Sequence, residues 1–183
     1  MSRIPAVDPA TAPANVKASL KGLESALRMT PNMFRVIANS GAALRGMIQL
    51  NAALGGGSLD RATREAIAIA AAQENGCDYC LSAHTAFGRQ AGLDDIGLAL
   101  ARAGKATDPK RHSVLQLTEA ILKKRGHISA EEFADAKRAG ISDAEVVQIV
   151  AEVALNVYTN YLNVLADTEI DFPVVRTTEP SPQ

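Results

Sequence analysis

The sequence has no tryptophan, and its aromatic residues make up only 4% of 183 positions. Aromatic platforms that stack the bases of single-stranded nucleic acids are therefore not expected. Neither sign of charge is in excess, because 19 basic and 20 acidic side chains leave a formal net charge of −1. Such a chain produces no field that attracts nucleic acid or an anionic membrane surface, and we expect neither as a partner.

Long hydrophobic runs are missing as well. A strongly apolar stretch such as residues 66–72 is far too short to span a membrane. The first eight residues lack the apolar segment of a signal peptide, so we expect a cytoplasmic protein. Only two cysteines are present, and the cytoplasm keeps thiols reduced. A closely spaced pair in that compartment indicates redox chemistry or metal binding more often than a permanent cross-link.

The distribution of proline predicts helices. All eight prolines lie before residue 32, at residue 109 or after residue 172, and the long spans between them are free to be helical. No alternating strand pattern interrupts these spans. We predict a single all-α domain over residues 1–183, with extended arms at 1–13 and 174–183. The predicted helices number about eight: 15–29, 31–54, 59–75, 77–91, 94–103, 109–125, 130–139 and 143–166.

Several helix ends are marked by capping residues. Thr30-Pro31 and Asp108-Pro109 each combine a capping side chain with a proline suited to the first helical position. Ser129–Glu132 and Ser142–Glu145 have the spacing of capping boxes. Glycines suited to a left-handed helix end stand at positions 76, 92, 104, 126 and 140.

The two cysteines stand directly after one of these glycines. Cys77, Cys80 and His84 are spaced i, i+3 and i+7, which places them on one face of a helix that begins after Gly76. Two helical residues three apart have Cα atoms about 5 Å apart, a separation that a disulfide accepts. The free N–H groups and the positive dipole end at a helix start favour a thiolate, so we expect the first cysteine to have a lowered pKa.

This arrangement suits a dithiol redox cycle. One thiolate attacks a peroxide oxygen and becomes a sulfenic acid, the second cysteine condenses with it, and an outside dithiol resets the disulfide. His84 can move the proton, because an imidazole titrates near neutrality. Glu65 is the only acidic residue in the otherwise apolar run 65–72. It needs a polar partner, which we predict to be this imidazole; Arg61 and Arg64 are alternative partners.

Glu65, the pair Cys77-x-x-Cys80 and His84 together resemble the core signature of the alkylhydroperoxidase D (AhpD)-like proteins of the carboxymuconolactone decarboxylase superfamily. The glutamate stands twelve positions before the first cysteine, as it does in that group. The signature covers about residues 58–92.

The stretches Tyr158–Asn163 and Asp171–Pro173 resemble the longer, peroxidase-related branch of the same superfamily. The resemblance implies an all-α, AhpD-like helical bundle that assembles as a homotrimer or a homohexamer. It also implies an alkyl hydroperoxide reductase-like oxidoreductase. Its partners would be a hydroperoxide substrate and a dithiol reductant of the lipoyl or thioredoxin type.

Matching positions imply a role for each residue of the signature. Cys80 would attack the peroxide and Cys77 would resolve the sulfenic acid, while His84 and Glu65 would form the proton relay. We expect Cys77, at the helix end, to lie nearer to solvent. Tyr79 departs from the pattern, because well-studied members carry a second histidine there. A phenol is a poor base near neutrality, so this difference bears on the catalytic efficiency or on the substrate.

Alternatives to hydroperoxide reduction remain open. The superfamily name implies a decarboxylase-like proton transfer on a lactone, although that reaction needs no cysteine pair. A non-enzymatic redox protein or a zinc-stabilised oligomer is a further class, because Cys77, Cys80, His84 and Glu65 are all zinc-ligand types. Two buried thiols acting as small hydrophobes are the simplest alternative. We expect no cofactor and no bound metal.

Two further sets of polar residues need an interpretation. Asn156, Asn160 and Asn163 repeat along one face of an apolar helix. They would line the site, form hydrogen bonds across a subunit contact or lie exposed as a polar stripe. His112 and His127 stand among basic residues, and we expect both at the surface.

Overall fold

The computed structural model describes residues 2–178, which form nine helices and contain no strand. The predicted all-α class is therefore confirmed for this part of the chain. None of these helices has the length and apolarity needed to cross a membrane. The helices are α1 (Ala14–Leu27), α2 (Asn32–Ile37), α3 (Gly41–Gly55), α4 (Arg61–Glu74), α5 (Asp78–Gln90), α6 (Asp95–Arg102), α7 (Pro109–Lys124), α8 (Ala130–Arg138) and α9 (Asp143–Ala166).

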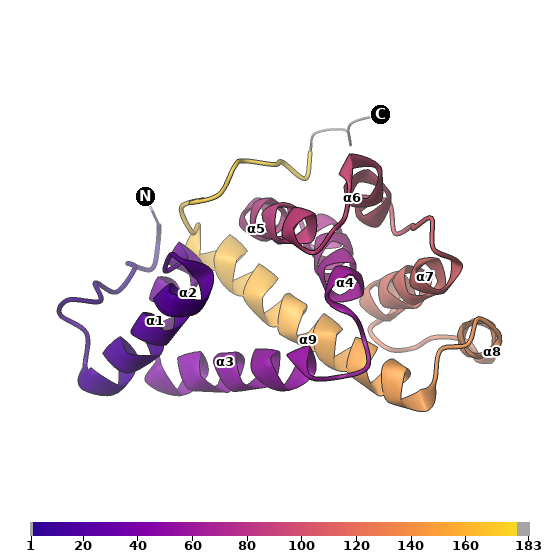
Figure 1. The fold of residues 1–183 in the computed structure, drawn as a ribbon, viewed down its shortest axis with the longest axis horizontal. Helices are drawn as coiled ribbons and strands as arrows, with labels where there is room; N and C mark the ends of the chain where they lie inside the picture. The colour runs from indigo at the N-terminus through magenta and orange to yellow at the C-terminus, as the bar shows by residue number, and fades with distance from the viewer. Residues whose placement is uncertain (1, 179–183) are drawn as a thin grey trace.

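Helix α4 lies at the centre of the bundle. Its residues 66–72 are all buried, and five of these seven side chains are alanines. Small side chains let neighbouring helices approach closely, and α4 contacts α5, α6, α7 and α9. Figure 1 shows the long α9 crossing the molecule, with α1 to α3 on one side of it and α4 to α8 on the other.

Helix α9 joins two hydrophobic clusters. The larger cluster surrounds α4 and includes Ile67 and Ile149. The smaller one is built from α1, α2 and α3 around Leu44, and it meets α9 at Leu155. Met33, which is partly buried, packs against both clusters. The candidate site lies where the two clusters meet.

The single helix predicted over residues 31–54 is wrong, because the chain turns at residues 38–40 and forms α2 and α3 instead. Ser40 caps α3 by accepting a backbone N–H of its first turn at 3.3 Å. Asn39 donates its side-chain N–H to the carbonyl of Val36 at 2.9 Å. Short polar side chains offer the backbone such local bonds in place of a continuous helix. Pro31 also precedes α2 as its N-cap residue and is not its first helical residue.

The other predicted helix ends are confirmed. Asp108 caps α7, with Pro109 at its first position, and both capping boxes, Ser129–Glu132 and Ser142–Glu145, are formed. Glycines 76, 92, 104, 126 and 140 all have positive φ, the left-handed conformation that commonly ends a helix. The remaining boundaries differ from the predicted ones by one or two residues.

The chain ends run along the helices. After α9, the C-terminal segment passes over α5 towards α6 (Figure 1), and the N–H of Val175 donates to Ser82 Oγ at 2.9 Å. Near the other end, the N–H of Arg3 donates to the carbonyl of Ala166 at 2.6 Å. The predicted arms, 1–13 and 174–183, include residue 1 and residues 179–183, which lie outside the described residues.

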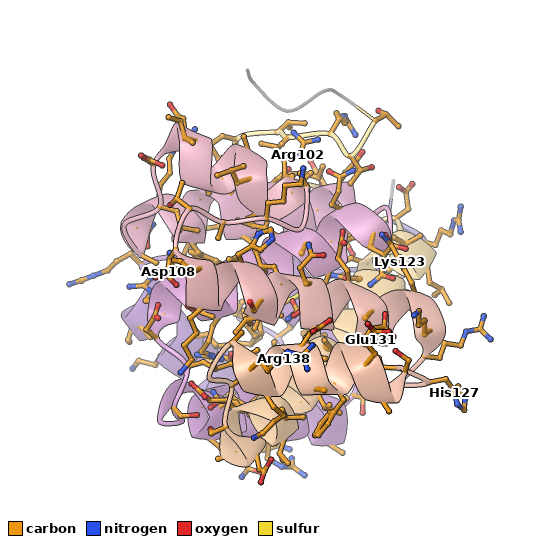
Figure 2. The ribbon with its side chains drawn as sticks, turned by 90° about the vertical axis from the view of Figure 1, so that its right-hand side faces the viewer. Arg102, Asp108, Lys123, His127, Glu131 and Arg138 are labelled. Atoms are coloured by element: carbon orange, nitrogen blue, oxygen red, sulfur yellow. A yellow bond between two sulfur atoms is a disulfide. The ribbon has the colours of Figure 1, made fainter. Side chains whose placement is uncertain are left out.

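The remaining histidines lie away from the cysteines. Figure 2 shows α7 and α8 side by side with charged side chains along them, and His127 points outward from this face. Lys124 of α7 bonds Glu132 of α8 at 2.6 Å. His127 is exposed as expected, whereas His112 is half-buried, and its Nδ1 accepts the N–H of Ala106 at 3.3 Å. Neither ring belongs to the candidate site.

Two glycine substitutions test the close packing around α4. A Cβ at Gly88 in α5 would lie 2.9 Å from Leu98 Cδ2 and 3.4 Å from Ile69 Cδ1, both in buried side chains. A Cβ at Gly46, on the exposed side of α3, would meet nothing within 4 Å. We expect Gly46→Ala to stabilise the protein by about 0.5–1 kcal/mol through helix propensity. Gly88→Ala should destabilise it by about 1 kcal/mol net, because overpacking exceeds that gain.

Urea unfolding followed by circular dichroism measures both free energies of unfolding. Equal stabilisation by the two substitutions would show that α4, α5 and α6 are less tightly packed than described.

Candidate active site

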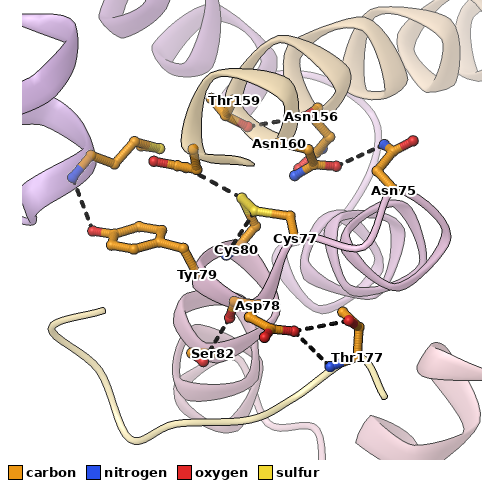
Figure 3. The surroundings of a disulfide bond; sticks show 12 residues. Asn75, Cys77, Asp78, Tyr79, Cys80, Ser82, Asn156, Thr159, Asn160 and Thr177 are labelled. Atoms are coloured by element: carbon orange, nitrogen blue, oxygen red, sulfur yellow. Dashed lines mark hydrogen bonds between the residues drawn. A yellow bond between two sulfur atoms is a disulfide. The ribbon is translucent and has the colours of Figure 1, made fainter. Parts of the chain in front are cut away.

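The two cysteines form a disulfide at the start of α5. Cys77 is the N-cap residue of this helix, as predicted, and its sulfur accepts the N–H of Cys80 at 3.2 Å. The two Cα atoms are 5.3 Å apart, a separation that one helical turn supplies. Figure 3 shows the two sulfurs between α5 and α9. The bond therefore closes without unwinding the helix.

Both cysteines are buried, Cys77 at 1% and Cys80 at 2% exposure. The expectation that Cys77 lies nearer to solvent is therefore wrong. The end of α4 and the side chains of α9 surround the helix start that carries Cys77. Of the two cysteines, only Cys80 lines the cavity described below. A reagent that enters this cavity reaches the disulfide at Cys80.

His84 lies one turn after Cys80 and pairs with Glu65. The His84 Nδ1 and Glu65 Oε2 atoms are 2.8 Å apart, so the predicted contact between α4 and α5 is formed. An ionised carboxylate only accepts hydrogen bonds, so Nδ1 of His84 carries the hydrogen of this bond. Nε2 is then the basic nitrogen of the neutral ring. The alternative partners bond elsewhere: Arg64 pairs with Glu152, and Arg61 reaches only the side chain of Gln90.

A cavity of about 280 Å³ lies in front of these residues. One part of its wall is polar and combines Cys80, His84 and Glu65 with Arg64 and Glu152. The other part is apolar and is lined by Met33, Phe34, Met47, Phe87, Leu155 and Phe172. The cavity can therefore hold a molecule that has an apolar body and a polar reacting group.

The ion pair in this wall was not predicted from the sequence. Arg64 Nε lies 2.5 Å from Glu152 Oε1, and the same guanidinium donates to Asn51 Oδ1 at 3.0 Å. Glu152 is only 2% exposed. It is the only charged residue between positions 146 and 166. Like Glu65, it is therefore marked in the sequence as an isolated charge in an apolar run that needs a polar partner.

Tyr79, the residue that departs from the expected signature, holds two segments together. Its hydroxyl donates to Asp171 Oδ1 at 2.8 Å and accepts the N–H of Met33 at 3.0 Å. Its ring packs edge-on against Phe172. Burial raises the pKa of Tyr79 above its ordinary value, and the neighbouring Asp171 carboxylate adds to the increase. The phenol therefore stays protonated and is not a base.

The asparagine stripe of α9 faces the site and not the solvent. Asn156, Asn160 and Asn163 are 5%, 0% and 3% exposed, so the exposed-stripe alternative is wrong. Asn156 lines the cavity, Asn160 Oδ1 accepts from Asn75 Nδ2 at 2.8 Å, and Asn163 Nδ2 donates to Cys80 Sγ at 3.3 Å.

The zinc alternative has no ligand set in the described part of the chain. Both sulfurs belong to the disulfide, and within residues 2–178 no three His, Cys, Asp or Glu side chains are grouped to hold a metal ion. Zinc needs such ligands as thiolates, neutral imidazoles or carboxylates that converge on one point.

Replacing Tyr79 by phenylalanine tests its role in holding the two segments. The change leaves the N–H of Met33 and one oxygen of Asp171 without their partner, so we expect a loss of about 1–2 kcal/mol in the free energy of unfolding. Ser25→Ala is the control, because it removes an exposed hydroxyl that bonds the Lys21 carbonyl within α1. Thermal unfolding of the oxidised proteins measures both. Equal stability of the two variants would contradict the assigned role.

Part of the chain matches a known protein family. Residues 41–120 match the model of the carboxymuconolactone decarboxylase family, a range that includes the cysteine pair, His84 and Glu65. No curated protein sequence matches the chain significantly.

Several solved structures share the fold. The AhpD core of an uncharacterized peroxidase-related protein from Ralstonia eutropha JMP134 is 22% identical, with a TM-score of 0.84 over 93% of this chain and 92% of that one. An uncharacterized peroxidase-related protein from Silicibacter sp. TM1040 is 19% identical, with a TM-score of 0.80 over 92% and 91%. A Cys→Ala variant of the debrominase Bmp8 in complex with 2,3,4-tribromopyrrole is 18% identical, with a TM-score of 0.79 over 93% and 92%.

The family match and the shared fold extend the resemblance first seen around the cysteine pair. Neither the family match nor the fold similarity depends on the hydrogen bonds and distances within the site. The chain therefore has the fold of these peroxidase-related structures, and its residues 41–120 match the carboxymuconolactone decarboxylase family.

Proposed function

We propose that this protein is a thiol-dependent reductase of organic hydroperoxides. The observation that carries the proposal is the disulfide at the start of α5, with Cys80 facing a cavity that also holds the His84–Glu65 pair. A dithiol beside a base and an apolar cavity is what two-electron reduction of such a substrate requires. The roles of Cys80, Cys77, His84 and Glu65 given by the resemblance remain part of the proposal.

The first step uses Cys80 as the nucleophile. His84 Nε2 takes the thiol proton, and the thiolate attacks the outer oxygen of the hydroperoxide. The O–O bond breaks, Cys80 becomes a sulfenic acid, and the alkoxide takes the proton from the imidazolium to leave as the alcohol. Glu65 supports this transfer, because its bond to Nδ1 holds the ring and stabilises the imidazolium.

Cys77 then closes the cycle. Its sulfur attacks the Cys80 sulfenic acid, the S–O bond breaks, and water leaves as the disulfide forms. An outside dithiol restores both thiols by exchange and is itself oxidised to a disulfide. The burial of both cysteines favours a slender lipoyl-type dithiol that enters the cavity over a bulky thioredoxin-type protein. The cytoplasm, our expected location, supplies such reductants.

A second candidate is reductive removal of a halogen from an aromatic ring. Four of the chain's seven aromatic residues line the cavity: Phe34, Tyr79, Phe87 and Phe172. The Bmp8 debrominase has the same fold. In this reaction the dithiol supplies two electrons and a proton, so that a C–Br bond becomes C–H, bromide leaves and the disulfide forms. The lactone decarboxylase alternative gives the cysteine pair no role.

Turnover assays separate these candidates. Reduced protein is mixed with cumene hydroperoxide or with tribromopyrrole, and dihydrolipoamide serves as the reductant. Loss of peroxide supports the first candidate, and release of bromide supports the second. Absence of both reactions would leave the proton-transfer and non-enzymatic alternatives.

Cysteine variants test the two sulfur roles. We expect Cys77→Ser to react once with peroxide and stop at a sulfenic acid, because no second thiol can condense with it. Cys80→Ser should lose the fast reaction altogether. Mass spectrometry identifies the oxidised sulfur, and stopped-flow measurement follows the peroxide. Undiminished peroxide reduction by Cys80→Ser would reverse the assignment.

Substitutions in the imidazole–carboxylate pair test the proton transfer. We expect His84→Ala to slow the first step by about 100- to 10,000-fold, the usual contribution of general acid–base catalysis. Glu65→Gln should have a smaller effect in the same direction, because an amide still bonds Nδ1 but does not stabilise the imidazolium. His127→Ala removes an exposed ring outside the cavity and should not alter the rate. Equal rates for His84→Ala and His127→Ala would exclude His84 from the step.

We also propose that the protein is a homo-oligomer, a homotrimer or homohexamer as the resemblance implies. The exposed side of α9 supports self-association, because no charged side chain is exposed from residue 147 to 166. Tyr161 and Leu165 are each 60% exposed, and Val147 is 70% exposed. Such a continuous apolar face is typical of an interface.

Light scattering tests this oligomer. We expect Tyr161→Glu to shift the protein towards smaller species, because it buries a charge in the interface. Ile96→Glu changes an apolar residue that is 66% exposed on α6 and should leave the mass unchanged. A monomeric parent protein would contradict the proposal.

A further inference from the structure

Two buried amides of α9 lie against the disulfide, and both are incompletely hydrogen-bonded. Asn163 Nδ2 donates to Cys80 Sγ at 3.3 Å, yet its Oδ1 has no hydrogen-bond partner among the described residues. Asn160 Oδ1 accepts from Asn75, while its Nδ2 has no partner in the same part of the chain. Asn160 is 0% exposed and Asn163 is 3% exposed, so solvent does not satisfy these atoms.

Such groups are costly in a protein interior. An unpaired buried amide loses its bonds to water without replacement, and a neutral disulfide sulfur is only a weak acceptor. A leucine at either position would avoid this cost while keeping a similar size. The amides are therefore expected to contribute in another state of the site, one in which the sulfurs are stronger acceptors.

That state is the reduced one. We propose that Asn163 and Asn160 stabilise the thiolates of the reduced pair, with Asn163 serving Cys80 and Asn160 serving Cys77. The inference concerns the ionisation of the two thiols. It rests on the proposed function only in taking a hydroperoxide as the oxidant. The inference thus adds two residues to the site residues that the resemblance gave. Both touch or adjoin the reacting sulfurs.

The orientation of Asn160 is fixed by its neighbour. Asn75, the residue that caps the end of α4, donates to Asn160 Oδ1, so the Nδ2 group points the other way. Figure 3 shows Asn160 between Asn75 and Cys77, on the same side of the disulfide as Asn156 and Thr159. When the S–S bond opens, the sulfur of Cys77 moves away from that of Cys80 and gains room to accept this donor.

Reduction makes these bonds stronger. A dithiol reductant delivers two electrons and two protons, the S–S bond breaks, and two thiols result. When His84 takes the proton of Cys80, the sulfur becomes an anion that still faces Asn163 Nδ2. A hydrogen bond to an ionised group is roughly twice as strong as a neutral one, so the amide favours the thiolate over the thiol.

Alkylation of single thiols by iodoacetamide tests the assignment without peroxide or reductant turnover. In a Cys77→Ser background, only the Cys80 thiolate reacts, and its rate against pH gives the thiol pKa. We expect Asn163→Leu to raise the midpoint by about one pH unit, which lowers the thiolate fraction about tenfold below that midpoint. Asn163→Asp should raise it further, because a carboxylate repels the thiolate.

A matched control separates this effect from general loosening of the core. Thr118 is 0% exposed on α7, and its hydroxyl bonds only within that helix, so Thr118→Val removes a buried polar group outside the site. This variant should keep the parent midpoint. If Asn163→Leu does not fold, Asn163→Ala removes the same donor with less bulk and provides the same measurement. A Thr118→Val shift as large as that of the Asn163 variants would overturn the proposal.

The Cys80→Ser background reports on the other sulfur through the ultraviolet absorbance of its thiolate against pH, because Cys77 does not line the cavity. Asn160→Leu should raise the midpoint of Cys77 by about one pH unit. An unchanged midpoint in either background overturns the assignment for that sulfur. A protein that fails to reduce hydroperoxides and yet shows both shifts would refute the proposed function and leave this inference standing.

Discussion

The left-handed turn at Gly76 is the constraint on which the site depends. Gly76 has φ of +66°, and the N–H of Cys77 returns to the carbonyl of Ala72 at 2.9 Å, which ends α4. The chain then reverses and α5 packs along α4. Glu65 and His84, 19 positions apart, thereby come within 2.8 Å of each other. The same turn leaves Cys77 as the N-cap of α5, with its sulfur towards the first free N–H groups.

Helix α9 supplies the opposite wall and decides its polarity. A long helix packed against both hydrophobic clusters would ordinarily present only apolar side chains to them. Beside Ile149, Val153 and Leu155, it also presents Glu152 and three asparagines. A buried ion pair such as Arg64–Glu152 contributes little net stability, because desolvation offsets the attraction. These polar groups are better understood as parts of a polar cavity than as supports of the fold.

The two residues between the cysteines serve the fold. Tyr79 bonds Asp171, and Asp78 accepts the N–H and the hydroxyl of Thr177 at 2.8 and 2.9 Å. Burial raises the pKa of Asp78, but these hydrogen bonds and Arg176 outweigh it and hold the pKa below its usual value. These two residues thus fasten the C-terminal segment to the first turn of α5.

The pairing of Glu65 with His84 was predicted from a lone carboxylate in an apolar run. The sequence by itself also determined the helical class, most helix ends and the alignment of Cys77, Cys80 and His84 on one helix face. These follow from local rules, since caps, glycine stops and positions three or four apart act within one or two turns. The tertiary structure alone decided that residues 31–54 break into two helices and that both cysteines are buried. It also decided that Glu152 and Asn156 line the cavity and that Asn163 contacts Cys80. Those outcomes depend on which helices pack together. A helical pattern shows that a face is polar but does not say which neighbour covers it, and only the packed bundle brings α9 against the start of α5.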